Sequence, residues 1–261
     1  MKDRYGEHIQ VGLHPGHVAE IIIDKPPNNH VSAELMRDLA DALEDLDGEN
    51  GCRSTLLRTA GKAFCAGADL VARDGIGGTG MAGINPLYDE AVRLFSAEKP
   101  IVAAIQGAAV GAGLGLAVVA DFRVAAPEAR FAANFVKLGF HPGFGLTHTL
   151  PALIGRQRAS LMFLTGRRVK ADEALEWGLV DQVVPLGELR EAGLSLAREI
   201  AENAPLAVVS TRKTLRGDLG KAVREQTNHE AVEQAWLRET EDYKEGVRAV
   251  NERRVGNFQG R

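Results

Sequence analysis

Two short stretches of small residues have the pattern of turns that present backbone amide groups to a ligand. The first is AFCAGADL at residues 63–70 and the second is AVGAGLGLA at residues 109–117; each follows an apolar, strand-like run. Because small side chains leave the N–H groups of such turns unshielded, an external acceptor can reach them. Two N–H groups that converge on one point would stabilise negative charge on a carbonyl oxygen, as an oxyanion hole does.

The glycines of the second stretch have two other interpretations, a dinucleotide-binding turn and close helix packing. A dinucleotide turn needs the pattern G-x-G-x-x-G and an acidic residue about 20 positions later. Here the third glycine is out of step, and the nearest acidic residue, Asp121, comes too early. The sequence therefore disfavours a nucleotide-binding fold.

The composition gives no sign of a protein that binds nucleic acid or membranes. The 261 residues include 31 basic and 35 acidic side chains, a net charge of −4, without a long run of either sign. The N-terminus lacks the apolar core of a signal peptide, and no apolar run reaches membrane-spanning length. Cys52 and Cys65 form neither a disulfide framework nor a metal-ligand cluster. We expect a cytoplasmic protein with no metal site.

Alternating strands and helices before residue 185 predict an α/β architecture around both turns. Apolar and β-branched runs predict strands at residues 8–14, 18–24, 54–58, 101–105 and 122–125. Ser32 has the position of an N-cap, and Pro86 suits the first turn of a later helix. The glycine-rich stretch at residues 72–85 is a candidate flap over a pocket.

Beyond Pro185 the pattern becomes helical. Residues 188–202, 206–215 and 221–253 have helical patterning, and no clear strand follows. The change predicts a core at residues 1–185 and a C-terminal helical region at residues 186–261.

Further motifs extend along most of the chain. They are IIDKP at residues 22–26, KPIVAAIQG at 99–107, GRR at 166–168, ALEWGLVD at 174–181 and GVRA at 246–249. With the two turns, they resemble the crotonase (enoyl-CoA hydratase/isomerase) superfamily. The resemblance implies a spiral of ββα turns, with C-terminal helices that make the contacts of a homotrimer or homohexamer. It also implies an acyl-CoA thioester as ligand, so that coenzyme A is part of the substrate and no separate cofactor is needed.

The resemblance places the oxyanion-hole donors at the N–H groups of Ala68 and Ala112. The substrate-binding positions that it implies are Lys25, Pro26, Ala66, Gly67, Asp69, Leu70, Gly111, Gly115, Phe135, Gly143, Arg254 and Phe258. Of these, Arg254 and Phe258 would reach the CoA site of a neighbouring subunit. For Arg254, a solvated surface charge is the alternative.

Hydratases of the family use two glutamates, which together deprotonate a water molecule and protonate the α-carbon. The first glutamate's position here is Gly115 and the second is Phe135. Neither side chain can carry a proton. The resemblance therefore implies the scaffold without the usual acid–base pair, and simple hydration is disfavoured.

His141 and Tyr88 are the candidates to replace the glutamates. His141 precedes the Pro142-Gly143 turn, where a base near neutral pH could act, although it could instead bond a loop carbonyl. Tyr88 could donate a proton, or could simply pack in the core. Weaker candidates or ambiguous residues are Asp69, Asp74, Glu90, His148 and His30.

The sequence therefore predicts an enzyme of the enoyl-CoA hydratase/isomerase family that forms a thioester enolate or tetrahedral oxyanion. Double-bond isomerisation, decarboxylation and C–C or thioester hydrolysis all use the same hole. Phe135, Phe140 and Phe144 suggest a bulky or cyclic acyl group. A non-catalytic acyl-CoA-binding or assembly subunit is the alternative.

Overall fold

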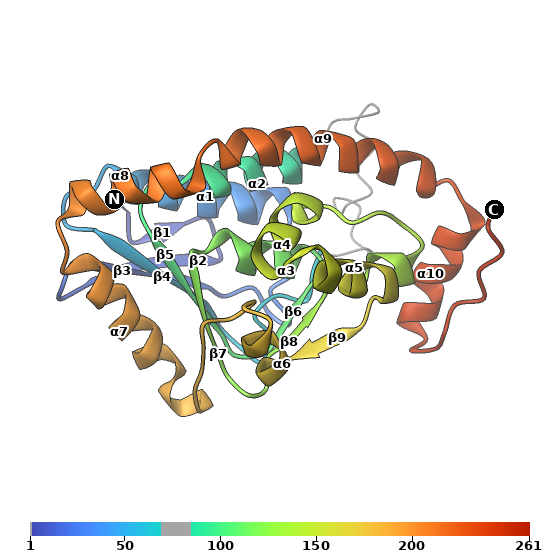
Figure 1. The fold of residues 1–261 in the computed structure, drawn as a ribbon, viewed down its shortest axis with the longest axis horizontal. Coiled ribbons are helices and arrows are strands. Elements are labelled where there is room, and N and C mark those ends of the chain that lie inside the picture. Colours follow the sequence, from blue (N-terminus) through green and yellow to red (C-terminus); the bar gives the residue numbers. More distant parts are fainter. Residues whose placement is uncertain (1, 69–84) are drawn as a thin grey trace.

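The strands of the molecule follow the apolar runs of its sequence. The computed structural model describes residues 2–68 and 85–261, and Figure 1 shows its two sheets. The larger sheet contains, in order, β1 (Arg4–Tyr5), β2 (Ile9–His14), β3 (Val18–Ile23), β4 (Ser54–Thr59), β5 (Ile101–Ile105), β7 (Phe122–Ala125) and β10 (Gln182–Val183). The smaller contains β6 (Ala108–Val110), β8 (Arg130–Ala132) and β9 (Arg168–Lys170).

The larger sheet begins as an antiparallel hairpin and continues with parallel strands. β2 pairs antiparallel with β3, from Ile9 opposite Ile23 to His14 opposite Val18. β3, β4, β5, β7 and β10 then pair in parallel. Parallel sheets have both faces covered, and every residue of β5 is accordingly buried.

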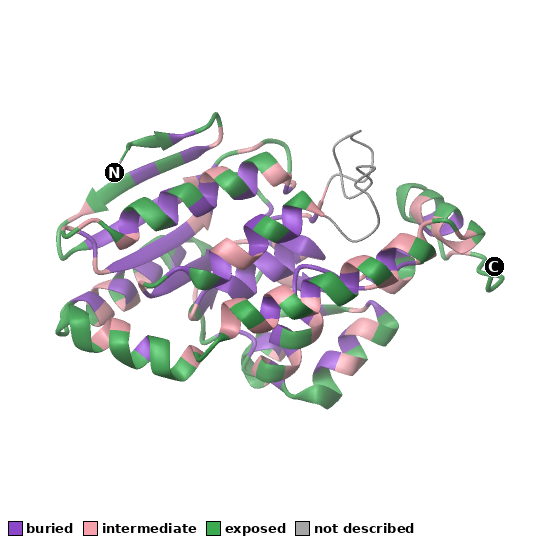
Figure 2. Cartoon of the chain, turned by 90° about the horizontal axis from the view of Figure 1, so that it is seen from above, coloured by how far each residue is buried: buried purple, intermediate pink, exposed green. Residues whose placement is uncertain are grey.

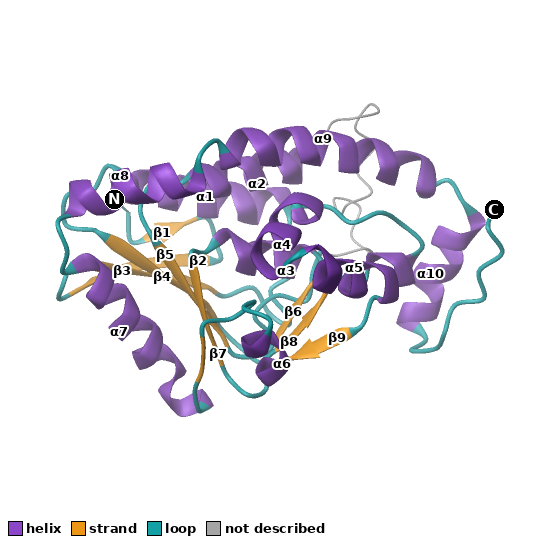
Figure 3. Ribbon diagram, viewed as in Figure 1, coloured by secondary structure: helices purple, strands orange, loops and turns teal. Residues whose placement is uncertain are grey.

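Helices cover both faces of this sheet (Figures 1 and 3). Leu57 and Ala103 belong to the core cluster that includes α1 (Ala33–Asp47) and α2 (Pro86–Ser96). The alternate residues, Leu56 and Val102, pack instead with α7 (Leu189–Ala201). Residues of β4 and β5 therefore alternate between two separate cores.

Polar side chains fix where the first two helices begin. Ser32 Oγ accepts the N–H of Leu35 at 3.2 Å, and Asn85 Oδ1 accepts the N–H of Leu87 at 3.1 Å. Pro86 occupies the first turn of α2, where its missing N–H costs no hydrogen bond.

The remaining helices all follow β6 along the chain. They are α3 (Ala112–Val119), η1 (Phe135–Leu138), α4 (Leu146–Ile154), α5 (Arg156–Thr165), α6 (Ala171–Glu176), η2 (Leu186–Glu188), α8 (Pro205–Arg216), α9 (Leu219–Leu237) and α10 (Glu241–Asn251). Every residue of α3 is buried, whereas α8 and α9 have long exposed faces (Figure 2). Within the described ranges, no helix is long and apolar enough to cross a membrane.

The expected mixed α/β fold and the helical C-terminal region are confirmed. The prediction of a single helix over residues 221–253 is wrong, because α9 ends at Leu237 and a separate helix, α10, begins at Glu241. There Thr240 caps the new helix by accepting the N–H of Tyr243 at 3.1 Å. The glycine-rich flap, apart from Asn85, lies outside the described residues. The boundary at residue 185 stays a prediction, although α7, which follows it, packs directly on the sheet.

Candidate active site

The two small-residue turns are bonded to each other side by side. The N–H of Cys65 donates to the carbonyl of Ala108 at 2.9 Å, and the carbonyl of Cys65 accepts the N–H of Val110 at 3.0 Å. A Cβ atom at Gly113 would overlap with the carbonyl of Cys65. Glycine is therefore required there for the start of α3 to approach the first turn so closely.

Ala68 and Ala112 line one cavity of about 290 Å³. Gly67 and Gly111 precede them with φ values of 97° and 55°, a region that favours glycine. Ala112 is the first residue of α3, so its N–H has no acceptor within the helix. The two turns thus bring the predicted donor residues to one cavity, although their role as donors stays a prediction.

The rest of the cavity wall is largely apolar. Phe135 and Phe140 stand edge to face with ring centroids 5.7 Å apart, and both line the cavity beside Leu138. Val250 and Asn251 of α10 complete the wall. The C-terminal helix of the chain therefore covers the chain's own cavity.

Phe144 occupies the space beside Gly115, the first glutamate's position. A Cβ atom at Gly115 would lie 2.5 Å from Cδ1 of Phe144. Phe144 is fully buried and has a φ of 65°, which is rare for an aromatic residue. At the second position, Phe135 is also buried. Apolar rings therefore occupy the space at both positions where hydratases of the family have their glutamates.

His141 lines a different cavity from Ala68 and Ala112. That cavity, of about 380 Å³, lies between η1, α4, α5 and the end of α9. Among the described lining residues, only Phe140 is common to the two cavities. The Nδ1 atom of His141 is 2.8 Å from the carbonyl oxygen of Pro142, and its ring stands edge to face with His229 at 5.9 Å. A catalytic role for His141 stays a prediction.

Tyr88 is buried between α2 and α9. Its hydroxyl donates to Oε1 of Gln234 at 2.8 Å, while Nε2 of Gln234 donates to the carbonyl of His141 at 2.8 Å. Burial and the nearby Glu230 raise the pKa of Tyr88 well above its usual range. A Cβ atom at Gly143 would overlap with the Tyr88 hydroxyl, so glycine at 143 admits this contact. Tyr88 is not among the described residues that line the cavity of Ala68 and Ala112.

The other predicted substrate-binding residues are dispersed. Ala66 lines the cavity, Lys25 donates to Ser32 Oγ at 3.1 Å, and Pro26 is exposed.

The two C-terminal positions lie near the surface. Arg254 forms ion pairs with Glu245 of α10 and with Glu252, which follows α10, and Phe258 is 41% exposed. Asp69 and Leu70, together with the weaker candidate Asp74, lie outside the described residues.

Two weaker candidates have structural contacts elsewhere. Glu90, on α2, is buried and bound by Arg37 and Arg93, and it is not among the described residues that line the cavity. His148 lies in the first turn of α4, where its N–H donates to the carbonyl of Gly145 at 3.1 Å.

Glu230 is a buried acid that the sequence interpretation did not single out. Its carboxylate accepts the N–H of Gly145 at 2.8 Å and the N–H and hydroxyl of Thr147 at 3.1 and 2.5 Å. Burial raises its pKa to about 7. The sequence did contain a signal for a buried polar group here. It is a polar stripe at helical spacing, formed by Thr227, Glu230 and Gln234.

No group of three or more His, Cys, Asp or Glu side chains suited to a metal ion occurs in residues 2–68 and 85–261.

A covered parallel sheet with two bonded glycine turns over one cavity defines a protein of the crotonase superfamily. The chain belongs to the enoyl-CoA hydratase/isomerase family, whose model matches residues 14–261. It is 37% identical over 254 residues to a Thermus thermophilus protein provisionally named an enoyl-CoA hydratase. That match covers 95% of this chain and all of the relative. It is 33% identical to a carnitinyl-CoA dehydratase of Salmonella typhi, over 94% of this chain and 96% of the relative.

A solved structure has the same fold. The crystal structure of an enoyl-CoA hydratase/isomerase from Pseudoalteromonas atlantica superposes with a TM-score of 0.86 at 31% identity. The match covers 97% of this chain and all of that one. The chain therefore belongs to a family of enzymes that act on acyl-CoA thioesters.

Proposed function

We propose that the N–H groups of Ala68 and Ala112 hold the carbonyl oxygen of an acyl-CoA thioester and stabilise its enolate or tetrahedral oxyanion. The observation that carries this proposal is that the two turns are bonded to each other and line one cavity. Donors fixed before the reaction need no rearrangement when charge develops, and one such donor contributes about 3 kcal/mol to the barrier reduction.

The reaction that we propose is not hydration by two glutamates. Phe144 fills the space beside Gly115, and Phe135 forms part of the apolar wall. Isomerisation, decarboxylation and C–C hydrolysis share the oxyanion step and remain within the proposal. The names of the relatives point to hydration and dehydration, so crotonyl-CoA belongs in any test.

A non-catalytic acyl-CoA-binding subunit is the second candidate. The wall of Phe135, Leu138 and Phe140 supports it, because an apolar cavity can retain an acyl group without chemistry. We further propose that the chain assembles as a homotrimer or homohexamer.

The variant Ala112→Pro tests the oxyanion hole. It deletes the N–H at the first position of α3, where proline is well tolerated. Ala112→Gly is the matched control, because it keeps the N–H. Both variants and the wild type are offered crotonyl-CoA, a 3-enoyl-CoA, methylmalonyl-CoA and a 3-ketoacyl-CoA, with products identified by mass spectrometry and binding measured by calorimetry.

We expect the wild type to convert at least one thioester, and Ala112→Pro to lose about 10²- to 10³-fold in its turnover. Ala112→Gly should retain turnover. Equal turnover in Ala112→Pro and the wild type would contradict the proposed donor. Binding without turnover of any thioester would favour the non-catalytic subunit.

A further inference from the structure

One phenyl ring forms part of the wall of two cavities. Phe140 lines the cavity of Ala68 and Ala112, here called the acyl cavity, and also the second cavity of about 380 Å³ that His141 lines. We propose that Phe140 closes the acyl cavity toward the second cavity and so limits the length of the acyl chain that the protein accepts. This inference rests on the proposed function and assigns a specificity-determining residue to the same site.

The acyl cavity has polar groups at its two turns and apolar rings beside them. At the first turn, Nδ1 of His30 is 3.2 Å from the carbonyl oxygen of Gly67. At the second turn, a Cβ atom on Gly111 would lie 3.7 Å from Cζ of Phe135. The ring of Phe140 packs edge to face against Phe135, with centroids 5.7 Å apart. Contacts therefore run from the second turn through Phe135 to Phe140, the direction in which an apolar chain avoids the polar groups.

The wall between the two cavities is only one helical turn thick. It consists of η1 and the residues that follow it. Phe135 and Leu138 line the acyl cavity, whereas Val136 and Gly139 line the second cavity. Among the described residues, Phe140 is the one that lines both, and it is 3% exposed. We therefore expect deletion of this one ring to join the two cavities.

The second cavity has the lining that an apolar chain requires. Phe163, Leu164 and Leu237 contribute apolar side chains to it. Leu164 is 77% exposed, so the cavity opens to the surface on that side. Space for a longer acyl chain therefore exists beyond Phe140, and in the wild type the ring blocks the way to it.

Aromatic and cationic contacts hold the Phe140 ring in the wall. It stands edge to face with Tyr243 of α10, at 5.6 Å between centroids, in addition to its contact with Phe135. The guanidinium carbon of Arg238 lies 5.9 Å from the ring centroid, over the ring. Because rotation of the ring out of the wall would break these contacts, the wall is closed before an acyl-CoA binds.

The test compares the affinities of butyryl-, octanoyl- and lauroyl-CoA, measured by calorimetry below the concentration at which the thioesters form micelles. Free CoA is the reference ligand. Phe140→Ala deletes the ring, and Phe140→Leu keeps a smaller apolar side chain. Phe163→Ala is the matched control, because it removes a ring from the second cavity and Phe163 is not among the described residues that line the acyl cavity. Thermal unfolding checks that each variant is folded.

The readout is the ratio of the affinities for lauroyl- and octanoyl-CoA, because this ratio cancels any change in the binding of the CoA part. We expect the wild type and Phe163→Ala to bind lauroyl-CoA no more tightly than octanoyl-CoA. In Phe140→Ala each further buried methylene group should tighten binding about fourfold, so the ratio should rise about 10²-fold. Phe140→Leu should give a smaller rise.

Three results would overturn the proposal. The first is a wild type that already binds lauroyl-CoA much more tightly than octanoyl-CoA. The second is a wild-type ratio in Phe140→Ala or, where that variant does not fold, in Phe140→Leu. The third is an equal rise in Phe163→Ala, which would indicate general loosening of the second cavity.

Failure of this inference is distinguishable from failure of the proposed function. If the wild type binds every acyl-CoA no more tightly than free CoA, the proposed function fails. If Ala112→Pro keeps wild-type turnover, the proposed oxyanion donor fails. If acyl-CoA binding is intact, Ala112→Pro loses turnover and the affinity ratio is unchanged in Phe140→Ala, only the assignment of Phe140 falls.

Discussion

At the scale of single residues, the ring of Phe144 packs into the space that a side chain at Gly115 would occupy, and this contact shapes the site. A Cβ atom at 115 would lie 2.5–2.9 Å from three atoms of Phe144. We expect Gly115→Ala to lower the free energy of unfolding by about 1–3 kcal/mol through overpacking. Phe144→Ala should cost about 3–5 kcal/mol, because it leaves a cavity. The double variant should cost less than the sum, as measured by denaturant unfolding.

Gly12→Ala is the control for the glycine substitution. Nothing lies within 4 Å of a Cβ atom at this position on β2, so the free energy of unfolding should change by no more than about 0.5 kcal/mol. Strictly additive costs in the Gly115→Ala, Phe144→Ala double variant would contradict direct packing between the two positions. Restoring a glutamate at 115 would accordingly require a smaller residue at 144.

Individual residues were predictable where their role is local. Ser32 was recognisable as a cap from its place before an apolar helical run, and the structure confirms it. Phe144 against Gly115 depends on how two distant segments pack, which one sequence does not show. Likewise, His30 was ambiguous in the sequence, because its relation to Gly67 arises only when the segments around them pair.

Glu230 links two elements, because a side chain of α9 binds the N-terminus of α4. The N–H groups of Gly145 and Thr147 at that terminus both donate to its carboxylate. Burial raises the pKa of Glu230 to about 7, above that of an unfolded glutamate. The folded protein therefore binds the proton more tightly, so this group's contribution to stability is complete at low pH. It is lost as the pH rises through about 7.

Glu230→Gln isolates this contribution, because glutamine does not titrate. We expect the stability of the wild type relative to Glu230→Gln to fall by about 3 kcal/mol between pH 4.5 and pH 8. Urea unfolding of both proteins across this range measures the difference and cancels the other titrating groups. A difference that is constant with pH would show that Glu230 has an ordinary pKa in the folded protein.

The long elements were predictable from periodicity, and the short ones were not. The strands at 54–58, 101–105 and 122–125 and the helix after Ser32 appear almost as expected. β6, β8 and β9 have three residues each, too few to show an alternating pattern, and pairing between distant segments creates them. The break at Thr240 was missed because the polar residues around it also suit an exposed helix.

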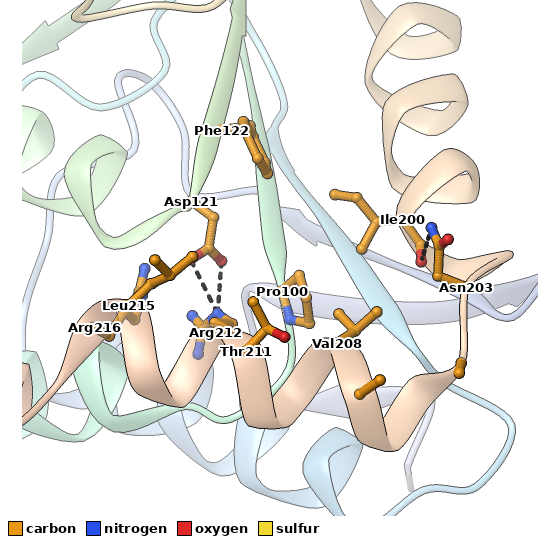
Figure 4. Close-up of a pocket in the computed structure, with 12 residues that line it drawn as sticks. Pro100, Asp121, Phe122, Ile200, Asn203, Val208, Thr211, Arg212, Leu215 and Arg216 are labelled. Carbon is orange, nitrogen blue, oxygen red and sulfur yellow. Dashed lines mark hydrogen bonds and ion pairs between the residues drawn. The ribbon is translucent and has the colours of Figure 1, made fainter.

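At the scale of the whole molecule, an apolar groove lies between α8 and the end of α7 (Figure 4). Its volume is about 610 Å³, and Phe122, Val208 and Leu215 contribute apolar side chains. Leu215, which lines the groove, is 83% exposed. A contiguous apolar surface of this kind is typical of a subunit contact, and the family resemblance implied such contacts for the C-terminal helices.

Leu215→Asp tests whether α8 holds the subunits together. We expect light scattering to give the wild type three or six times the mass of one chain. The variant should shift toward a single chain, because a carboxylate buried in an apolar interface loses its hydration without a partner. Leu13→Asp is the control: Leu13 is 44% exposed on the β2 hairpin, away from the groove, and its variant should keep the wild-type mass. A wild type that is already a single chain, or a Leu215→Asp variant of unchanged mass, would exclude α8 as the assembly surface.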